Sequence, residues 1–175
     1  MPSLTDALAH WHEFYTLLGT ASATMVGLLF VAATVGSGVF TAERRAPLRV
    51  FLSASVVHFS GVLAASLIVL APVRNWALFG LLILGCGMFG LGYSCQTWRD
   101  TVRDGLSKSI DLDDKIWYAA LPLVGYLLET AAGIALALQS DVGVAALALS
   151  MGMLLMVGIH NAWDITVWSI TRRRE

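Results

Sequence analysis

Five long stretches of mostly apolar residues constrain the fold of this chain more than any other feature of its sequence. They cover residues 14–40, 48–71, 75–96, 116–139 and 142–169. A membrane-spanning helix needs about 20 consecutive apolar residues, and a helix satisfies its own backbone hydrogen bonds in lipid. Hydrophobic residues make up 57% of the chain and charged residues only 13%, which does not suit a soluble surface. We expect an all-α integral membrane protein, a bundle of five transmembrane helices forming one membrane domain over residues 1–175.

Lysine and arginine residues gather on one side of this predicted bundle. Ten of the 11 lie in loop 41–49, in loop 97–115 or in the C-terminal tail: Arg44, Arg45, Arg49, Arg99, Arg103, Lys108, Lys115, Arg172, Arg173 and Arg174. The other side holds Arg74 alone. Because basic residues in short loops stay in the cytoplasm, we expect a cytoplasmic loop 97–115, a cytoplasmic C-terminus and an N-terminus outside. The chain is then a multi-pass protein of the plasma membrane, the inner membrane of a bacterium.

Charge and motif content argue against several classes of function. The net charge of −1 and the scattered basic residues give no basic face of the kind that binds nucleic acid. The sequence also lacks a phosphate-binding loop, a nucleophile elbow and a zinc-binding helix. An enzyme is therefore not the expected function. The expected partners are the lipid bilayer and a membrane protein, either a second copy of this chain in a homo-oligomer or another protein.

Four ionisable side chains fall inside the predicted membrane, where charge is unfavourable. They are His58, Glu129, His160 and Asp164. A charged side chain at the centre of a membrane helix costs about 2.5–3.5 kcal/mol on insertion scales, so such residues need a partner or a purpose. Glu129 lies fourteen residues after Lys115, about 21 Å along a helix that rises about 1.5 Å per residue. We therefore place Glu129 near the middle of the membrane.

Polar neighbours accompany these four residues on the predicted helices. Tyr126 shares the helical face of Glu129, and Asn161 stands beside His160. His160 and Asp164 are one turn apart and face the same way, so the carboxylate can orient the imidazole or both can hold a cation. Histidine and carboxylate chains serve as proton relays because their charge states interconvert near physiological pH. We expect these six residues to line a path that moves protons, a cation or a small solute.

Two alternatives concern cofactors. His58 and His160 lie at similar depth on two predicted helices, where they would ligate a b-type haem axially in a redox subunit. A weaker candidate is a metal site at the outer mouth of the bundle, formed by His10, His12 and Glu13. Because these three residues lie just outside the predicted membrane, their presence needs no metal to explain it. We expect no metal and no cofactor, with haem b as the alternative.

Small and hydroxyl-bearing residues line one face of the first predicted helix. Within an arc of about 140° of a helix with 3.6 residues per turn lie Thr16, Gly19, Thr20, Ala23, Thr24 and Gly27. Small residues at this spacing let two helix backbones come close, and threonine hydroxyls can hydrogen-bond across the interface. We therefore expect this face to pack against another helix. The main alternative to transport is an accessory or scaffold subunit, which would dock a larger membrane complex through such faces.

Overall fold

The computed structural model describes residues 3–39, 42–103 and 115–171, and over these ranges the chain is helical with no β-strand. The predicted all-α fold is confirmed. In chain order the helices are α1 (Leu4–Ala9), α2 (His12–Val39), α3 (Ala42–Leu70), α4 (Trp76–Arg103), the π-helical segment η2 (Ile116–Ala120), α6 (Leu121–Ala137) and α7 (Val142–Thr171). Segment η2 runs directly into α6, so the two form one continuous helical stretch.

Four of these helical stretches are long and apolar enough to cross a membrane. They are His12–Val35, Trp76–Arg99, Ile116–Ala137 and Val142–Asp164. In α3 the apolar described stretch, Ala54–Leu70, is shorter. Large apolar side chains such as Phe30, Phe89 and Leu149 are exposed on the outside of the bundle, and so broad an apolar surface suits lipid rather than water. By length and composition the chain is a multi-pass membrane protein.

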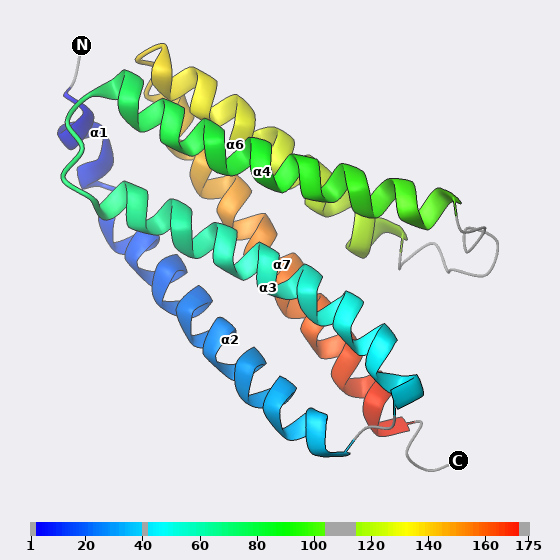
Figure 1. Cartoon of the computed structure of the whole chain (residues 1–175). Coiled ribbons are helices and arrows are strands. Elements are labelled where there is room, and N and C mark those ends of the chain that lie inside the picture. Colours follow the sequence, from blue (N-terminus) through cyan, green and yellow to red (C-terminus); the bar gives the residue numbers. More distant parts are fainter. Residues whose placement is uncertain (1–2, 40–41, 104–114, 172–175) are drawn as a thin grey trace.

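The long helices form two pairs that α7 joins (Figure 1). Helix α4 packs along α6, α2 packs along α3, and α7 contacts both α6 and α3. We call the end of the bundle that holds α1 the N-terminal end. The opposite end, where α2, α4 and α7 finish, is the C-terminal end. Toward the C-terminal end the two pairs diverge (Figure 1).

Glycines allow α4 and α6 to pack with their backbones in contact. A Cβ atom placed on Gly80 would lie 2.7 Å from the carbonyl oxygen of Gly133 and 2.6 Å from Cα of Ala137. A Cβ on Gly87 would lie 2.7 Å from the amide nitrogen of Thr130. Because backbone atoms cannot rotate away as a side chain can, any side chain here would push the two helices apart. This close pairing holds the buried face of α6 firmly in place.

Helix α1 was not predicted, and it covers the N-terminal end of the bundle. Leu4 is 2% exposed and packs in the same apolar cluster as Tyr15 of α2 and Phe79 of α4. A capping box begins α1: the N–H of Asp6 donates to Oγ of Ser3, and the N–H of Ser3 donates to the Asp6 carboxylate. The Ser3 hydroxyl also donates to this carboxylate at 2.7 Å. These hydrogen bonds, chiefly the one from the hydroxyl, lower the pKa of Asp6 below its ordinary value.

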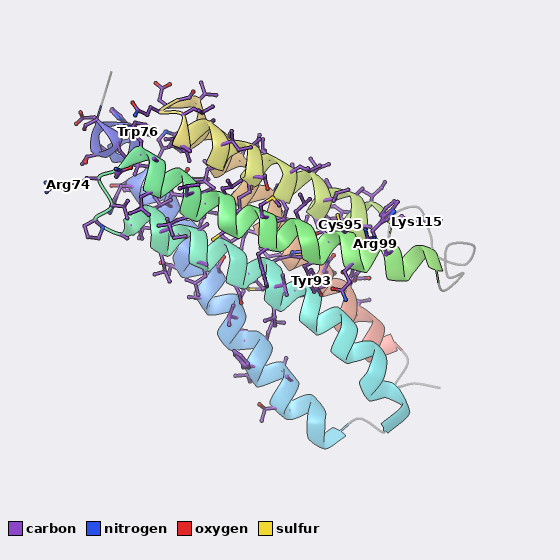
Figure 2. All side chains as sticks on the ribbon, turned by 45° about the horizontal axis from the view of Figure 1, so that its top comes forward. Arg74, Trp76, Tyr93, Cys95, Arg99 and Lys115 are labelled. Carbon is purple, nitrogen blue, oxygen red and sulfur yellow. The ribbon has the colours of Figure 1, made fainter. Side chains whose placement is uncertain are left out.

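The predicted boundaries also change at two loops. Helix α3 begins at Ala42, so residues 42–49 of the predicted loop 41–49 are helical. The second change follows the third long apolar stretch. Helix α4 continues to Arg103, so residues 97–103 of the predicted loop 97–115 are helical. The remaining residues of that loop before Lys115 lie outside the described ranges. Figure 2 shows Arg99 and Lys115 at the C-terminal end of the bundle and Arg74 at the N-terminal end. The described lysine and arginine side chains therefore lie at the ends of the bundle, away from its middle.

Candidate functional site

Glu129 lies on the buried face of α6, in the interior of the bundle. It is 1% exposed, and Pro122, Gly125, Tyr126 and Gly133 are buried on the same helix. Within the described part of the chain, neither of its carboxyl oxygens has a hydrogen-bond partner. Leaving a buried polar group unsatisfied costs about 1–3 kcal/mol, and more for a charged group. An acid in this position weakens the fold, so its presence calls for a functional explanation.

Tyr126, one turn before Glu129 on α6, connects three helices. Its hydroxyl oxygen lies 2.9 Å from Nδ1 of His58 on α3, within hydrogen-bond distance, and His58 is 2% exposed. The Tyr126 ring packs directly on Gly90 of α4, where a Cβ atom would collide with it. A Cβ on Gly61 of α3 would lie 3.6 Å from the same hydroxyl oxygen. Tyr126 therefore spans the interior from α4 to α3 and is hydrogen-bonded to a buried imidazole.

Titratable groups of α4 also lie close to this centre. Cys86 is near enough to interact electrostatically with Glu129, and Tyr93 is near enough to interact with Tyr126. The Cys86 side chain is partly buried, and neither described cysteine is in a disulfide. Of the described acidic side chains, Glu129 alone is buried. The centre therefore combines one carboxyl group with phenol, imidazole and thiol groups.

The three predicted site residues of α7 have different surroundings. His160 and Asp164 contact η2, whereas Asn161 has no polar partner among the described residues. His160 stacks on the indole ring of Trp117, with ring centroids 3.9 Å apart and planes 18° apart. Asp164 is exposed and accepts a hydrogen bond from the Tyr118 hydroxyl at 3.0 Å. Asn161 is fully buried, and neither atom of its amide group has a hydrogen-bond partner among the described residues. Segment η2 therefore holds His160 and Asp164, whereas Asn161 points into the bundle.

Asn161 lies slightly nearer the C-terminal end than His58. A Cβ on Gly158 of α7 would lie 2.6 Å from Cε1 of the Phe59 ring. This glycine therefore packs directly against that ring of α3. Asn161 follows Gly158 by three residues, about 4.5 Å along α7 at about 1.5 Å per residue. Ser55 precedes Phe59 by four residues, about 6 Å along α3 in the same direction. Asn161 and Ser55 therefore lie at similar depth, between His58 and the C-terminal end.

Further buried polar groups without a partner lie at the depths that follow toward the C-terminal end. Ser94 of α4 is buried about 6 Å beyond Gly90, at about 1.5 Å per residue. Its hydroxyl and that of Ser55 have no hydrogen-bond partner among the described residues. We call the following set the buried polar series: Glu129, Tyr126, His58, Ser55, Ser94 and Asn161. Neither serine was predicted as a site residue, since a serine in an apolar helix carries no signal of its own.

The predicted cofactor candidates remain separate from this series. His10, His12 and Glu13 are exposed near the start of α2. Within the described ranges, no three histidine, cysteine or acidic side chains come together in a way that could hold a metal ion. His58 bonds to Tyr126, and His160 stacks on an indole. Ligation of haem b by these two histidines stays a prediction, which a Soret band in the purified protein would test.

The predicted packing face of α2 is largely open within this chain. The hydroxyl groups of Thr16, Thr20 and Thr24 each donate to the carbonyl oxygen four residues earlier on the same helix, at 2.8–2.9 Å. These threonines, with Ala23 and Gly27, are exposed. Gly19 is the exception, because it packs against α3, where its Cβ would lie 2.8 Å from Cβ of Ser66. Contact between the rest of this face and a second chain stays a prediction.

A carboxyl, a phenol and an imidazole in one buried series are the groups that pass protons within proteins. Comparison of the chain with protein-family models, with curated proteins and with solved structures finds no match. The chemistry of the buried polar series is therefore the main guide to function.

Proposed function

We propose that this protein moves protons, a cation or a small solute across the plasma membrane along the buried polar series. The observation that carries the proposal is the Glu129 carboxyl group. It is buried at the centre of the bundle, and both of its oxygens lack a hydrogen-bond partner within the described ranges. A carboxyl group that served as glue between helices would instead be hydrogen-bonded across an interface. A site that binds and releases a transported species must keep its ligand atoms available.

The proposal includes five membrane spans, with the N-terminus outside and the C-terminus in the cytoplasm. Helix α3 has 29 residues, about 44 Å at about 1.5 Å per residue, which exceeds the roughly 30 Å hydrocarbon core of a bilayer. The position of Arg99 and Lys115 at the C-terminal end, opposite Arg74, supports this orientation (Figure 2). In intact cells, an epitope tag at the N-terminus should bind antibody from outside, and a tag at the C-terminus should not. The reverse labelling would refute the orientation.

Flux through proteoliposomes tests the transport function. The purified chain is reconstituted, and the fluxes of protons, monovalent cations and small neutral solutes are measured with a pH-sensitive dye, ion-sensitive dyes and osmotic swelling. We expect flux of one of these classes above protein-free liposomes. Glu129→Gln keeps the size of the side chain and removes its ability to ionise, so it should abolish that flux. Glu13→Gln is the matched control, because Glu13 is exposed at the start of α2.

Three results would count against the transport proposal. The first is the absence of any flux from wild-type protein that is folded and reconstituted. The second is a wild-type flux that Glu129→Gln leaves unchanged. A flux lost equally in Glu13→Gln and Glu129→Gln would also count against it, because that loss would follow from charge removal at any position.

An accessory or scaffold role is the second candidate, and the open face of α2 favours it. Ala23 and Gly27 are exposed there, and a Cβ on Gly27 would meet no atom within 4 Å. Small exposed residues suit the close approach of another membrane helix. A scaffold would co-purify with a specific larger partner, lose that partner in Ala23→Leu and tolerate Glu129→Gln. Retention of the partner by Ala23→Leu would argue against this role for the face.

A further inference from the structure

We infer that the species bound at Glu129 is a proton, and that Tyr126 and His58 relay it between Glu129 and the C-terminal end of the bundle. This inference rests on the proposed transport function and names its substrate class. It makes Glu129 the proton-binding group, and Tyr126 and His58 the groups through which the proton moves.

The ligand groups around Glu129 suit a proton better than a metal cation. Calcium takes six to eight oxygen ligands and magnesium needs a near-octahedral set. The described polar side chains nearest to Glu129 along α6 are Tyr126 and Thr130, and Cys86 is the group that approaches from α4. The Thr130 hydroxyl lies against the Gly87 position of α4. One carboxyl group with so few oxygen neighbours cannot replace the water shell of a cation, whereas a proton needs a single oxygen.

Glu129 and Tyr126 lie on the same buried face of α6. Tyr126 precedes Glu129 by three residues, about 4.5 Å along the axis at about 1.5 Å per residue. Neither oxygen of the Glu129 carboxyl group has a hydrogen-bond partner within the described ranges, so this group is free to rotate toward the Tyr126 hydroxyl. The Tyr126 hydroxyl in turn lies 2.9 Å from Nδ1 of His58. Proton transfer requires heavy atoms within about 2.6–3.2 Å. The contact between Tyr126 and His58 satisfies that distance, whereas the step from Glu129 needs its carboxyl group to rotate against the Tyr126 hydroxyl.

The relay moves one proton and needs water as the only other reactant, at its two ends. Once the Glu129 carboxylic acid has rotated against the Tyr126 hydroxyl, this hydroxyl gives its proton to Nδ1 of neutral His58 while its oxygen takes the proton of Glu129. This step leaves a Glu129 carboxylate, an intact Tyr126 hydroxyl group and an imidazolium ion at His58. The imidazolium then releases its Nε2 proton to water at the C-terminal end, on the side of Ser55 and Asn161. A proton from water at the other end of the bundle restores the Glu129 carboxylic acid, and exchange of protons with water returns neutral His58 to the tautomer that carries its hydrogen on Nε2. The bonds formed and broken are all O–H and N–H bonds, and the charge lost at the imidazole leaves with the proton.

The groups that face this relay come from each helix packed against α6. Helix α4 contributes Cys86 and Tyr93, which interact electrostatically with Glu129 and Tyr126, respectively. Helix α3 contributes His58. On α7 the described titratable groups in the inner half are His160 and Asp164, which Trp117 and Tyr118 of η2 hold. Within the described interior, Glu129, Tyr126 and His58 are therefore the titratable groups that succeed one another toward the C-terminal end.

Infrared spectroscopy of reconstituted protein tests the proton site without measuring transport. We expect a carbonyl stretching band from a protonated carboxyl group that shifts in deuterium oxide and disappears on raising the pH. The band should be absent in Glu129→Gln and present in Glu13→Gln. Exchange of sodium for potassium, or addition of calcium or magnesium, should not move it. A band that responds to a cation at constant pH, or that is absent from wild-type protein at every pH, would overturn the inference.

Proton flux in Tyr126→Phe tests the relay. Phenylalanine keeps the ring that packs on Gly90 and removes the hydroxyl that contacts His58. We expect proton flux to fall by about 10²-fold, the usual effect of losing a positioned proton-transfer group, while the infrared band of Glu129 persists and shows that the site is intact. Wild-type flux in a folded Tyr126→Phe protein would refute the relay. Flux of another ion or solute instead of protons would refute the inference and leave the transport proposal standing, whereas no flux of any kind would refute both transport and relay.

Discussion

Replacing Glu129 with methionine should make the protein more stable while removing its function. Methionine has a similar length and volume but no polar atom that needs a hydrogen bond, so the surrounding packing is kept. Both oxygens of Glu129 lack a partner within the described ranges, and relieving an unsatisfied buried group is worth about 1–3 kcal/mol. The free-energy cost of placing a polar side chain in the membrane largely cancels between the folded and unfolded states, because the unfolded chain also keeps its helices in the membrane. We therefore expect the free energy of unfolding to rise by about 1–3 kcal/mol.

The sign of this change separates a functional acid from a structural one. A glutamate that holds helices together by hydrogen bonds contributes about 0.6 kcal/mol on average in membrane proteins, so its replacement would lower stability. Unfolding of bicelle-embedded protein by sodium dodecyl sulfate, followed by circular dichroism, measures the difference. Glu129→Gln serves as the comparison, because the amide stays polar and unpaired and should leave stability close to that of the wild type. A loss of stability in Glu129→Met would refute the reasoning that this carboxyl group is unpaired for a functional purpose.

Two further predictions concern the fold. Gly80→Ala should destabilise the protein by about 1–3 kcal/mol, because its Cβ would meet backbone atoms of Gly133 and Ala137. Gly85→Ala on the same helix is the control, since its Cβ would meet nothing within 4 Å. This variant should be neutral or gain up to about 1 kcal/mol of stability from helix propensity. Equal effects in the same unfolding titration would refute the close pairing of α4 and α6. The capping box of α1 should stabilise that helix at pH values above the ordinary pKa of an aspartic acid and lose this contribution as the pH falls through the lowered pKa of Asp6. Nuclear magnetic resonance titration should show a lowered pKa for Asp6 in the wild type and a higher one in Ser3→Ala, and identical values would contradict the capping box.

Much of the fold could be predicted from hydrophobicity, because lipid imposes a length and a composition on every helix that crosses it. Four of the predicted stretches correspond to helices long and apolar enough to span a membrane. Helix α1 could not be found in this way. It has six residues, and its position depends on how Leu4 packs against residues of α2 and α4 that are distant in the sequence.

Helical periodicity identified the buried face of α6, but it could not identify the contacts between helices. Glu129 and Tyr126 share a face because they are three residues apart on one helix. The contact between Tyr126 and His58 depends instead on which helices are neighbours, and no pattern within one helix specifies that. The same limit applies to His160 and Asp164, whose spacing suggested a pair although each one meets an aromatic side chain of η2.

The threonines of α2 illustrate a further limit of sequence patterns. A stripe of hydroxyl groups suggests a partner helix, yet Thr16, Thr20 and Thr24 satisfy their hydroxyl groups on the backbone of α2 itself. The side of α2 that packs within this chain carries Tyr15, Leu18 and Ser22. Because a threonine can face lipid once its hydroxyl group is bonded to its own helix, its presence does not by itself identify a packing surface.

Covalent labelling of Glu129 during transport tests the central claim most directly. An apolar carbodiimide adds to a protonated carboxyl group in an apolar environment, and mass spectrometry of the digested protein gives the labelled fraction at each acid. Proton flux should fall in proportion to labelling at Glu129, while the exposed Glu13 and Asp141 stay largely unlabelled. Complete labelling of Glu129 with unchanged flux, or loss of flux with Glu129 unlabelled, would contradict a transport path through this carboxyl group.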